Sequence, residues 1–203
     1  MRKITGLVIS AGLSGRMGKF KPLLEFDNKT FLEHIILKLD KICSRIIIVT
    51  GYRNDLAKKE IVNRLSICNQ EVLGKIAWQY NPEYKKGMLT SLQAGLKTVE
   101  DAEWVLYHFV DQPNIPTDFY NKFAAQADRS FDWIQPCYSG KSGHPILISQ
   151  KLIPAILNLN TEQSLRDLET IMQVNRTYWN CNYKEILQDF DTPEQLEQLI
   201  QEN

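Results

Sequence analysis

The amino-acid sequence predicts an α/β protein with three layers, α/β/α, built around a mostly parallel sheet. Short apolar runs typical of buried strands alternate with segments of helical periodicity along nearly all 203 residues. Polar clusters containing glycine or proline follow several of these runs, as expected where a ligand sits at the carboxyl ends of parallel strands. Because neither an internal repeat nor a low-complexity segment divides the chain, we expect a single domain over residues 1–203.

The first half of the chain supplies most of the predicted sheet. Continuous apolar runs predict strands at Thr5–Ser10, Arg45–Thr50, Ile76–Tyr80 and Trp104–Val110, with a brief extended piece at Leu23–Phe26. Thr30 and Glu33 have the spacing of a capping box, which predicts a helix from Phe31 to about Ile42. Two further helices are expected, one capped by Asn54 and running to about Leu65, the other over Leu89–Val99.

The second half continues the alternation with shorter elements. Helices are predicted from a Thr117 cap to about Ala127, at Gln150–Leu157 and at Leu165–Met172. Extended segments are expected at Trp133–Tyr138, His144–Ile148 and Thr177–Cys181, with a flexible turn over 139–143. A final helix to about Ile200 is predicted because Thr192, Pro193 and Gln195 combine a cap, a proline at the first helical position and the spacing of a capping box.

The composition narrows the class of protein. The formal net charge is +0, so no global charge favours binding to nucleic acid or to an anionic membrane. Hydrophobic residues make up 43% of the chain, which is typical of globular proteins. The four cysteines are widely scattered, which disfavours a zinc site or a disulfide framework, and the N-terminal apolar run is too short for a signal peptide or a membrane span. We therefore expect a cytoplasmic protein.

The loop after the first predicted strand has the features of a phosphate site. Its three glycines, Gly12, Gly15 and Gly18, would let backbone amides approach phosphate oxygens, while Arg16 and Lys21 supply positive charge. The spacing matches neither the Walker loop nor the dinucleotide fingerprint. The alternative interpretation is a surface loop whose basic side chains are simply solvated.

Acidic residues occur where a metal ion would be needed. Asp111 follows the strand predicted at Trp104–Val110, and Asp189 and Asp191 lie two residues apart, hence on one side of an extended segment. Carboxylates so placed can hold Mg²⁺ beside substrate phosphates. The alternative is that Asp111 belongs only to a turn before Pro113 and that Asp191 only caps the last helix.

Two other segments are candidates for the walls of a site. Asn81, Gly87 and Ser91 belong to a polar entry to a helix, whose N-terminus favours anions. His144 lies between Gly143 and a proline, and its alternative role is purely structural. Because no Ser/His/Asp relay is apparent, the pattern indicates catalysis by positioning and charge neutralisation.

Five motifs in order resemble one enzyme family over essentially the whole chain. The segment Ile9–Leu24, with Ala11, Gly12, Ser14, Arg16, Met17, Gly18 and Lys21, resembles the signature of the molybdenum cofactor nucleotidyltransferases, the MobA-like NTP transferases. The segment Asn81–Leu96 is similar to the second motif of their molybdopterin cytidylyltransferase branch. The remaining motifs are Asp111-Gln112-Pro113, Gly143-His144-Pro145 and the segment Asp189–Glu194.

This resemblance implies a Rossmann-like fold of the nucleotide-diphospho-sugar-transferase type. It implies transfer of a nucleotidyl group from CTP or GTP to the phosphate of a molybdopterin-type acceptor, with release of pyrophosphate. Arg16, Lys21 and Asp111 would be catalytic, and Asp111 and Asp191 would bind Mg²⁺ or Mn²⁺. His144 would contact the acceptor. The nucleotide would be bound by Ser10, Ala11, Gly12, Ser14, Gly15, Arg16, Lys21, Asn81, Gly87 and Ser91.

Several alternatives stay open on the sequence. Ala11 favours CTP, since the guanylyl-transferring relatives tend to carry glycine there, while Ser10 and the Phe109-Val110 pair depart from the usual pattern of the pocket wall. Asp189 competes with Asp191 as the second metal ligand. The acceptor is alternatively another phosphorylated alcohol or sugar. The chain is alternatively a non-catalytic protein that delivers the cofactor to a molybdoenzyme. The client enzyme would be a molybdenum hydroxylase.

Overall fold

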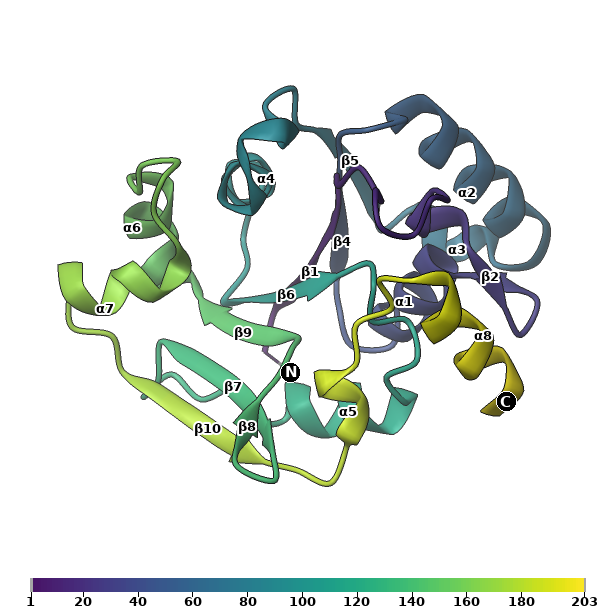
Figure 1. Ribbon diagram of the computed structural model, residues 1–203. Coiled ribbons are helices and arrows are strands. Elements are labelled where there is room, and N and C mark those ends of the chain that lie inside the picture. The colour runs from purple at the N-terminus through teal and green to yellow at the C-terminus, as the bar shows by residue number, and fades with distance from the viewer. Residues whose placement is uncertain (1, 203) are drawn as a thin grey trace.

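The central element of the computed structural model, which describes residues 2–202 except for the side chains of residues 68 and 202, is one large sheet (Figure 1). Within those residues, the sheet contains eight strands and has the order β10-β7-β9-β6-β1-β4-β5, with β8 paired to β7. Its strands are β1 (Ile4–Ser10), β4 (Arg45–Thr50), β5 (Ile76–Tyr80), β6 (Trp104–Phe109), β7 (Trp133–Tyr138), β8 (Lys141–Ser142), β9 (Ile146–Ser149) and β10 (Arg176–Asn180).

The sheet is mostly parallel, which confirms the prediction, and β9 is the main exception. β1 pairs in parallel with both β4 and β6, and β10 pairs in parallel with β7. β9 runs antiparallel to β6 and to β7. It follows β7 and the short strand β8 directly, and without a crossover helix the chain can return only in the opposite direction. The turn expected over 139–143 contains β8, which pairs antiparallel with β7.

Two apolar cores lie on opposite faces of the sheet because the inner strands are apolar at consecutive positions. In β4, Ile46 and Ile48 face the larger core, and Ile47 and Val49 face the other. The larger core is covered by α1 (Phe31–Leu39), α2 (Asn54–Cys68) and α5 (Thr117–Ala124). The opposite face is covered by α4 (Met88–Leu96), α6 (Ile153–Leu157) and α7 (Leu168–Ile171). This is the predicted three-layer arrangement.

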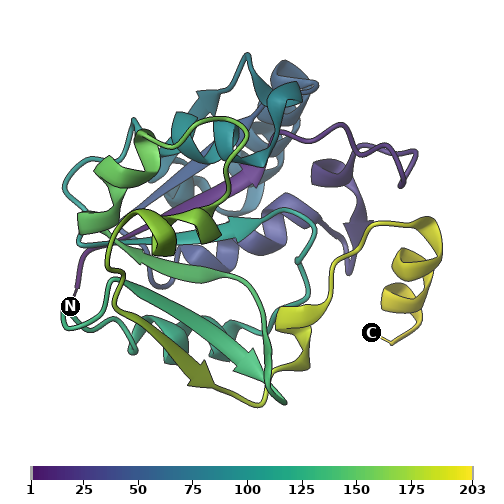
Figure 2. The same ribbon diagram turned by 60° about the vertical axis from the view of Figure 1, so that its left-hand side comes forward.

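Two helices begin as the sequence predicts. Thr30 caps α1 by a complete capping box, with the Thr30 hydroxyl accepting from the Glu33 amide and the Glu33 carboxylate accepting from the Thr30 amide. The last helix, α8 (Pro193–Glu202), follows Thr192, whose hydroxyl accepts from the Gln195 amide at 3.4 Å. Figures 1 and 2 show α8 on the side of the molecule that carries the loop after β1, so distant parts of the chain meet there.

Two predicted caps were wrong by one residue. Asn54 is the first residue of α2, after Arg53, which has a left-handed backbone (φ 51°) and makes no side-chain cap. The Asn54 side chain instead accepts a hydrogen bond from the Thr50 hydroxyl and so joins α2 to the end of β4. Thr117 likewise is the first residue of α5, which follows Pro116.

The remaining elements are short. A hairpin of β2 (Glu25–Phe26) and β3 (Lys29–Thr30) precedes α1, and the small helix α3 (Gln70–Leu73) was not predicted. Single 3-10 turns lie at Lys21–Leu23, Tyr84–Lys86, Gln150–Leu152, Leu165–Asp167 and Lys184–Leu187. Cys43, Cys137 and Cys181 are free thiols, while the side chain of Cys68 lies outside the described part. No helix within residues 2–202 has the length and hydropathy needed to cross a membrane.

Candidate active site

A cavity of about 350 Å³ lies at the carboxyl ends of β1 and β6, where the sequence places its polar clusters. Its floor is the end of β1 and its walls are the following loop, the start of α4 and the Asp111 turn. The lining includes most of the predicted site residues, namely Ser10, Ala11, Gly12, Ser14, Gly15, Arg16, Lys21, Gly87, Ser91, Asp111 and Asp191. We refer to it as the nucleotide cavity, after the role that the sequence predicts for these residues.

The loop after β1 owes its shape to tight backbone turns. Ser14 and Gly18 both have positive φ, 56° and 66°, and the Gly18 amide donates to the Gly15 carbonyl at 3.3 Å. The Ser14 hydroxyl accepts from the Lys21 amide at 3.0 Å, which closes the loop upon itself. A Cβ atom at Gly12 or Gly15 would meet nothing within 4 Å, so the backbone there stands open to the cavity.

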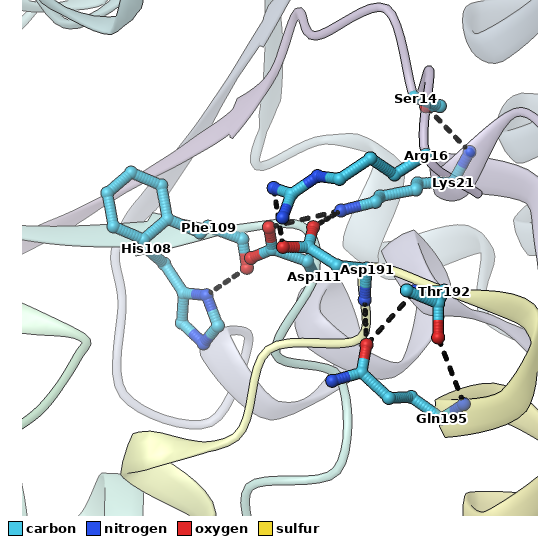
Figure 3. Close-up of polar contacts among 9 residues, drawn as sticks. All are labelled: Ser14, Arg16, Lys21, His108, Phe109, Asp111, Asp191, Thr192 and Gln195. Atoms are coloured by element: carbon cyan, nitrogen blue, oxygen red, sulfur yellow. Dashed lines mark hydrogen bonds and ion pairs between the residues drawn. The ribbon is translucent and has the colours of Figure 1, made fainter.

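Four charged side chains meet at the mouth of the nucleotide cavity (Figure 3). The Lys21 ammonium contacts both carboxylates, that of Asp111 at 3.4 Å and that of Asp191 more closely. The Arg16 guanidinium pairs with the other oxygen of Asp191 at 2.6 Å. The Lys21 side chain is 12% exposed but that of Arg16 is 76% exposed, so Arg16 is the cation that can swing onto an incoming ligand.

Backbone and amide hydrogen bonds bring Asp191 to Asp111. The Phe190 amide donates to the Asp111 carbonyl at 2.9 Å, and the Gln112 side chain donates to the Ile186 carbonyl at 3.2 Å. The Gln195 side-chain oxygen accepts from the Asp191 amide at 2.7 Å, so the first turn of α8 also fixes this segment. Asp191 lines the cavity and Asp189 does not.

The donor set fits a hard divalent cation. Oδ1 of Asp111 is buried and has no hydrogen-bond partner, an arrangement that is costly for a carboxylate oxygen unless a cation or donor reaches it. Burial raises the pKa of Asp111; the Lys21 charge opposes this rise and the Asp191 charge adds to it. Within residues 2–202, no three His, Cys, Asp or Glu side chains form a metal cluster. Two carboxylates completed by substrate phosphates and water suit Mg²⁺ or Mn²⁺.

Of the three residues predicted around the start of α4, two line the nucleotide cavity and one does not. Gly87 and Ser91 line the nucleotide cavity, and Gly87 has φ 121°, which only glycine adopts without strain. Asn81 does not reach the cavity. It is buried, donates to the Thr90 and Ser91 hydroxyls at 3.0 and 2.9 Å, and accepts from the Glu83 amide. Asn81 therefore orients Ser91 from behind the wall.

His144 lies in a second cavity of about 690 Å³ beside the first. Its ring packs against Phe109, with centroids 4.7 Å apart. Burial, together with the nearby Arg166 charge, lowers the pKa of His144 to about 4, so the imidazole is neutral at pH 7. Phe109 and Met88 line both cavities and form the boundary between them.

Sequence reasoning missed several residues of these cavities. Tyr84 and Lys85 also line the nucleotide cavity, and their place in the segment Asn81–Leu96 was the available signal. Trp133, Gln135 and Arg176 line the second cavity. These three residues lie in strands, where the sequence pattern does not distinguish a side chain that lines a cavity from one that is packed in the core. No sequence signal therefore pointed to them.

The comparisons with known proteins agree with this geometry. The model of the MobA-like NTP transferase domain matches residues 6–177. The Escherichia coli (strain K12) protein named molybdenum cofactor cytidylyltransferase is 30% identical, over 96% of this chain and 94% of its own. A Bacillus cereus (strain AH820) protein named probable molybdenum cofactor guanylyltransferase is 25% identical, over 88% of this chain and 84% of its own.

A solved structure supports the fold. The crystal structure of Rv0371c from Mycobacterium tuberculosis superposes with a TM-score of 0.77 at 19% identity, over 98% of both chains. Its complex with manganese gives a TM-score of 0.69 at 17% identity, also over 98% of both chains. The family model covers most of the chain, and the match to the Escherichia coli relative covers nearly all of it. The chain therefore belongs to the MobA-like NTP transferase family of nucleotidyltransferases.

Proposed function

We propose that the protein transfers CMP from CTP to the phosphate of molybdopterin and releases pyrophosphate, with Mg²⁺ or Mn²⁺ at Asp111 and Asp191. The observation that carries the proposal is the four-charge cluster in the nucleotide cavity, where Arg16 and Lys21 face these two carboxylates. Paired carboxylates that can hold a cation, beside two basic side chains that can bind phosphates, are the parts that phosphoryl and nucleotidyl transfer require.

The reaction is a displacement at the α-phosphorus of CTP. An oxygen of the acceptor phosphate forms the new bond to this phosphorus, and the bond to the bridging oxygen of the β-phosphate breaks. Pyrophosphate leaves with the bonding electrons. The protein contributes no covalent nucleophile, so the role of its side chains is to align two anions and offset their repulsion.

Each side chain of the cluster then has a defined task. Arg16, which is mostly exposed, moves from Asp191 onto the leaving phosphates, which its guanidinium can grip in a bidentate manner. Lys21 is the point charge beside the triphosphate. It is held in the cavity by the hydrogen bond that its backbone amide donates to the Ser14 hydroxyl. A cation bound at Asp111 and Asp191 supplies Lewis-acid neutralisation of the phosphates.

The choice of CTP rests on two independent points. The position that carries glycine in guanylyl-transferring relatives is Ala11, whose side chain is buried at the floor of the nucleotide cavity. The relative named as a cytidylyltransferase is also more similar, over more of the chain, than the one named as a guanylyltransferase. The product is then delivered to a client enzyme, which we propose is a molybdenum hydroxylase.

The experiment is a pyrophosphate-release assay with CTP, GTP and ATP, each with molybdopterin and with a sugar phosphate as acceptor. We expect turnover with CTP and molybdopterin. Turnover with GTP alone would contradict the base assignment, and turnover only with the sugar phosphate would contradict the acceptor. Nucleotide binding without turnover on any acceptor would indicate a delivery protein.

A further inference from the structure

The second cavity has walls of an unusual composition. It lies on the sheet face covered by α4, between that helix and the segment 161–166. Its lining contains the aromatic rings of Tyr107, Phe109, Trp133 and Tyr178 together with two arginines, and no Asp or Glu side chain. We refer to it as the aromatic cavity. Flat rings and arginine side chains favour a planar ligand rich in hydrogen-bond acceptors or negative charge.

Arg176 is held in a fixed position in this wall. Its guanidinium carbon lies 4.7 Å from the Trp133 ring centroid and 4.9 Å from that of Tyr178. One terminal nitrogen pairs with Glu169 at 3.1 Å and the other donates to the Gln135 side-chain oxygen. Gln135 in turn donates to the Gly143 carbonyl at 3.1 Å, next to His144. Arg176 is therefore preorganised by partners on three sides, as a recognition residue should be.

Two donors in the same wall have no partner. The indole Nε1 of Trp133 and the Nε of Arg176 are both buried without a hydrogen bond. The Trp133 residue as a whole is 4% exposed. A buried N–H group without an acceptor loses its hydration with nothing in return, so such groups are rarely left without a partner. Both residues line the aromatic cavity and lie side by side on paired strands, since Trp133 is opposite Arg176 in the β7–β10 register.

Arg166 adds a second positive charge to the lining of this cavity. It is exposed, lines the aromatic cavity, and no ion pair or hydrogen bond occupies its side chain in the described part of the chain. His144, close to it, is neutral at pH 7 because burial lowers its pKa to about 4. The cavity thus offers two guanidinium groups, one fixed and one free, to an acceptor-rich ligand.

We propose that the aromatic cavity binds the planar heterocycle of the acceptor substrate, with Trp133, Arg176 and Arg166 as the residues that determine acceptor specificity. The ring lies against the aromatic walls, and its oxygen and nitrogen acceptors take the indole N–H and the guanidinium donors. This inference rests on the proposed nucleotidyl transfer. Since Phe109 and Met88 border both cavities, the acceptor phosphate reaches the nucleotide cavity across them.

The cavity chemistry favours a heterocycle over a sugar phosphate. A sugar carries hydroxyl groups that must also donate, and the Gln135 side chain is already used at both its oxygen and its nitrogen. The two buried groups of the wall that lack a partner, Trp133 Nε1 and Arg176 Nε, are both donors, which match ring carbonyls and ring nitrogens. A flat ring also fits the spacing of aromatic stacking better than a puckered one.

The test measures binding of a fluorescent, fully oxidised pterin with a phosphorylated side chain, without nucleotide, by fluorescence titration. Glucose 1-phosphate serves as the competitor. We expect the pterin to bind and the sugar phosphate not to displace it. Arg166→Gln should weaken pterin binding about tenfold, because a charge-assisted hydrogen bond is lost. Trp133→Phe, which keeps a ring but removes the N–H, should weaken it by a similar factor.

Controls separate this inference from the proposed function. CTP affinity of both variants should stay within about twofold of the unchanged protein, because neither residue lines the nucleotide cavity. Arg129→Gln, at an exposed arginine paired with Glu103 outside both cavities, should leave pterin affinity unchanged. Because Trp133 is buried, the thermal stability of the Trp133→Phe variant is measured first, and its pterin affinity is used only if that stability is unchanged. If the Trp133→Phe variant misfolds, the variant of the exposed Arg166 decides the test.

Two results would overturn the inference: pterin affinity unchanged in the Arg166 and Trp133 variants, or displacement of the pterin by glucose 1-phosphate. Loss of CTP turnover with pterin binding intact would instead count against the proposed nucleotidyl transfer and leave the ring site standing. The two failures are therefore distinguishable.

Discussion

The amide of Phe190 donates to the carbonyl of Asp111 at 2.9 Å, and this one backbone bond joins the two acidic segments of the site. Asp191, the next residue, is thereby held within reach of the cation that contacts Asp111. The bond depends on backbone atoms, so the side chains on either side of it can be changed separately.

Asp191→Asn and Asp189→Asn form a matched pair of neighbouring carboxylates. Asp191 contacts both cations of the cluster and lines the nucleotide cavity, whereas Asp189 does neither. We expect Asp191→Asn to lower kcat by about 10²-fold or more, since charge stabilisation at the reacting phosphates is lost. Asp189→Asn should retain most activity in the same pyrophosphate assay. Equal losses in the two variants would contradict the assignment of Asp191.

Lys21→Ala should separate turnover from cation binding. In the free protein the Lys21 ammonium occupies both carboxylates, so it competes with a divalent cation for them. Its removal should strengthen Mn²⁺ binding without nucleotide by about tenfold, given the size of a contact charge interaction near a protein surface. Turnover should nevertheless fall by orders of magnitude, as it should for Asp111→Ala.

Titration of Mn²⁺ by calorimetry tests this directly, with Lys151→Ala, at an exposed lysine outside the nucleotide cavity, as the control. If the Lys21→Ala protein unfolds cooperatively but binds Mn²⁺ no more tightly than the unchanged protein, then Lys21 does not compete with the cation for the two carboxylates.

Gly51→Ala should damage the nucleotide cavity although Gly51 does not line it. A Cβ atom there would lie 2.5 Å from Cγ of Tyr84 and 2.8 Å from the Ala11 carbonyl oxygen, so one wall or the floor must move. We expect about 1–3 kcal/mol of destabilisation and a clear loss of CTP affinity. Gly74→Ala is the control, with its nearest atom at 3.6 Å and an ordinary φ of −64°. Its stability should be unchanged or slightly raised.

His108→Gln tests the buried imidazole of His108, a residue of β6. His108 Nδ1 donates to the Phe109 carbonyl and Nε2 accepts from the Tyr120 hydroxyl, each at 2.7 Å, because a carbonyl can only accept. Burial lowers the pKa of His108 to about 3. The unfolded chain therefore takes up a proton below about pH 6.5 that the folded chain does not, so this residue makes stability fall with falling pH.

The glutamine variant lacks this proton uptake. We expect it to be less stable than the unchanged protein at pH 7.5, with the difference shrinking by about 1.4 kcal/mol per pH unit below about pH 6.5. Urea unfolding at pH 7.5, 6.5 and 5.5 measures the difference, in which contributions common to both proteins cancel. A constant difference across this range would show that His108 titrates normally.

The local sequence predicted elements well where the cause is local. Strand bounds at Arg45–Thr50, Ile76–Tyr80 and Trp133–Tyr138 are confirmed. In Arg45–Thr50 the cause is consecutive apolar residues, which are buried on both faces of the sheet. The Thr30–Glu33 capping box is also confirmed, because its hydrogen bonds join residues three apart in the chain. Asn54 failed as a cap because its side chain found a partner on another element, the Thr50 hydroxyl. Such a contact competes with capping and leaves no trace in the local pattern.

The sequence by itself determined the alternation of strands and helices, the loop rich in glycine after β1, and the order of the motifs that identify the family. Only the tertiary structure decided that Asp191 rather than Asp189 meets Lys21, that Asn81 stands behind the wall, and that Trp133 and Arg176 face one cavity. These contacts join side chains from strands far apart in the chain. They depend on strand order and register, which are set by packing of the whole sheet and not by any one segment.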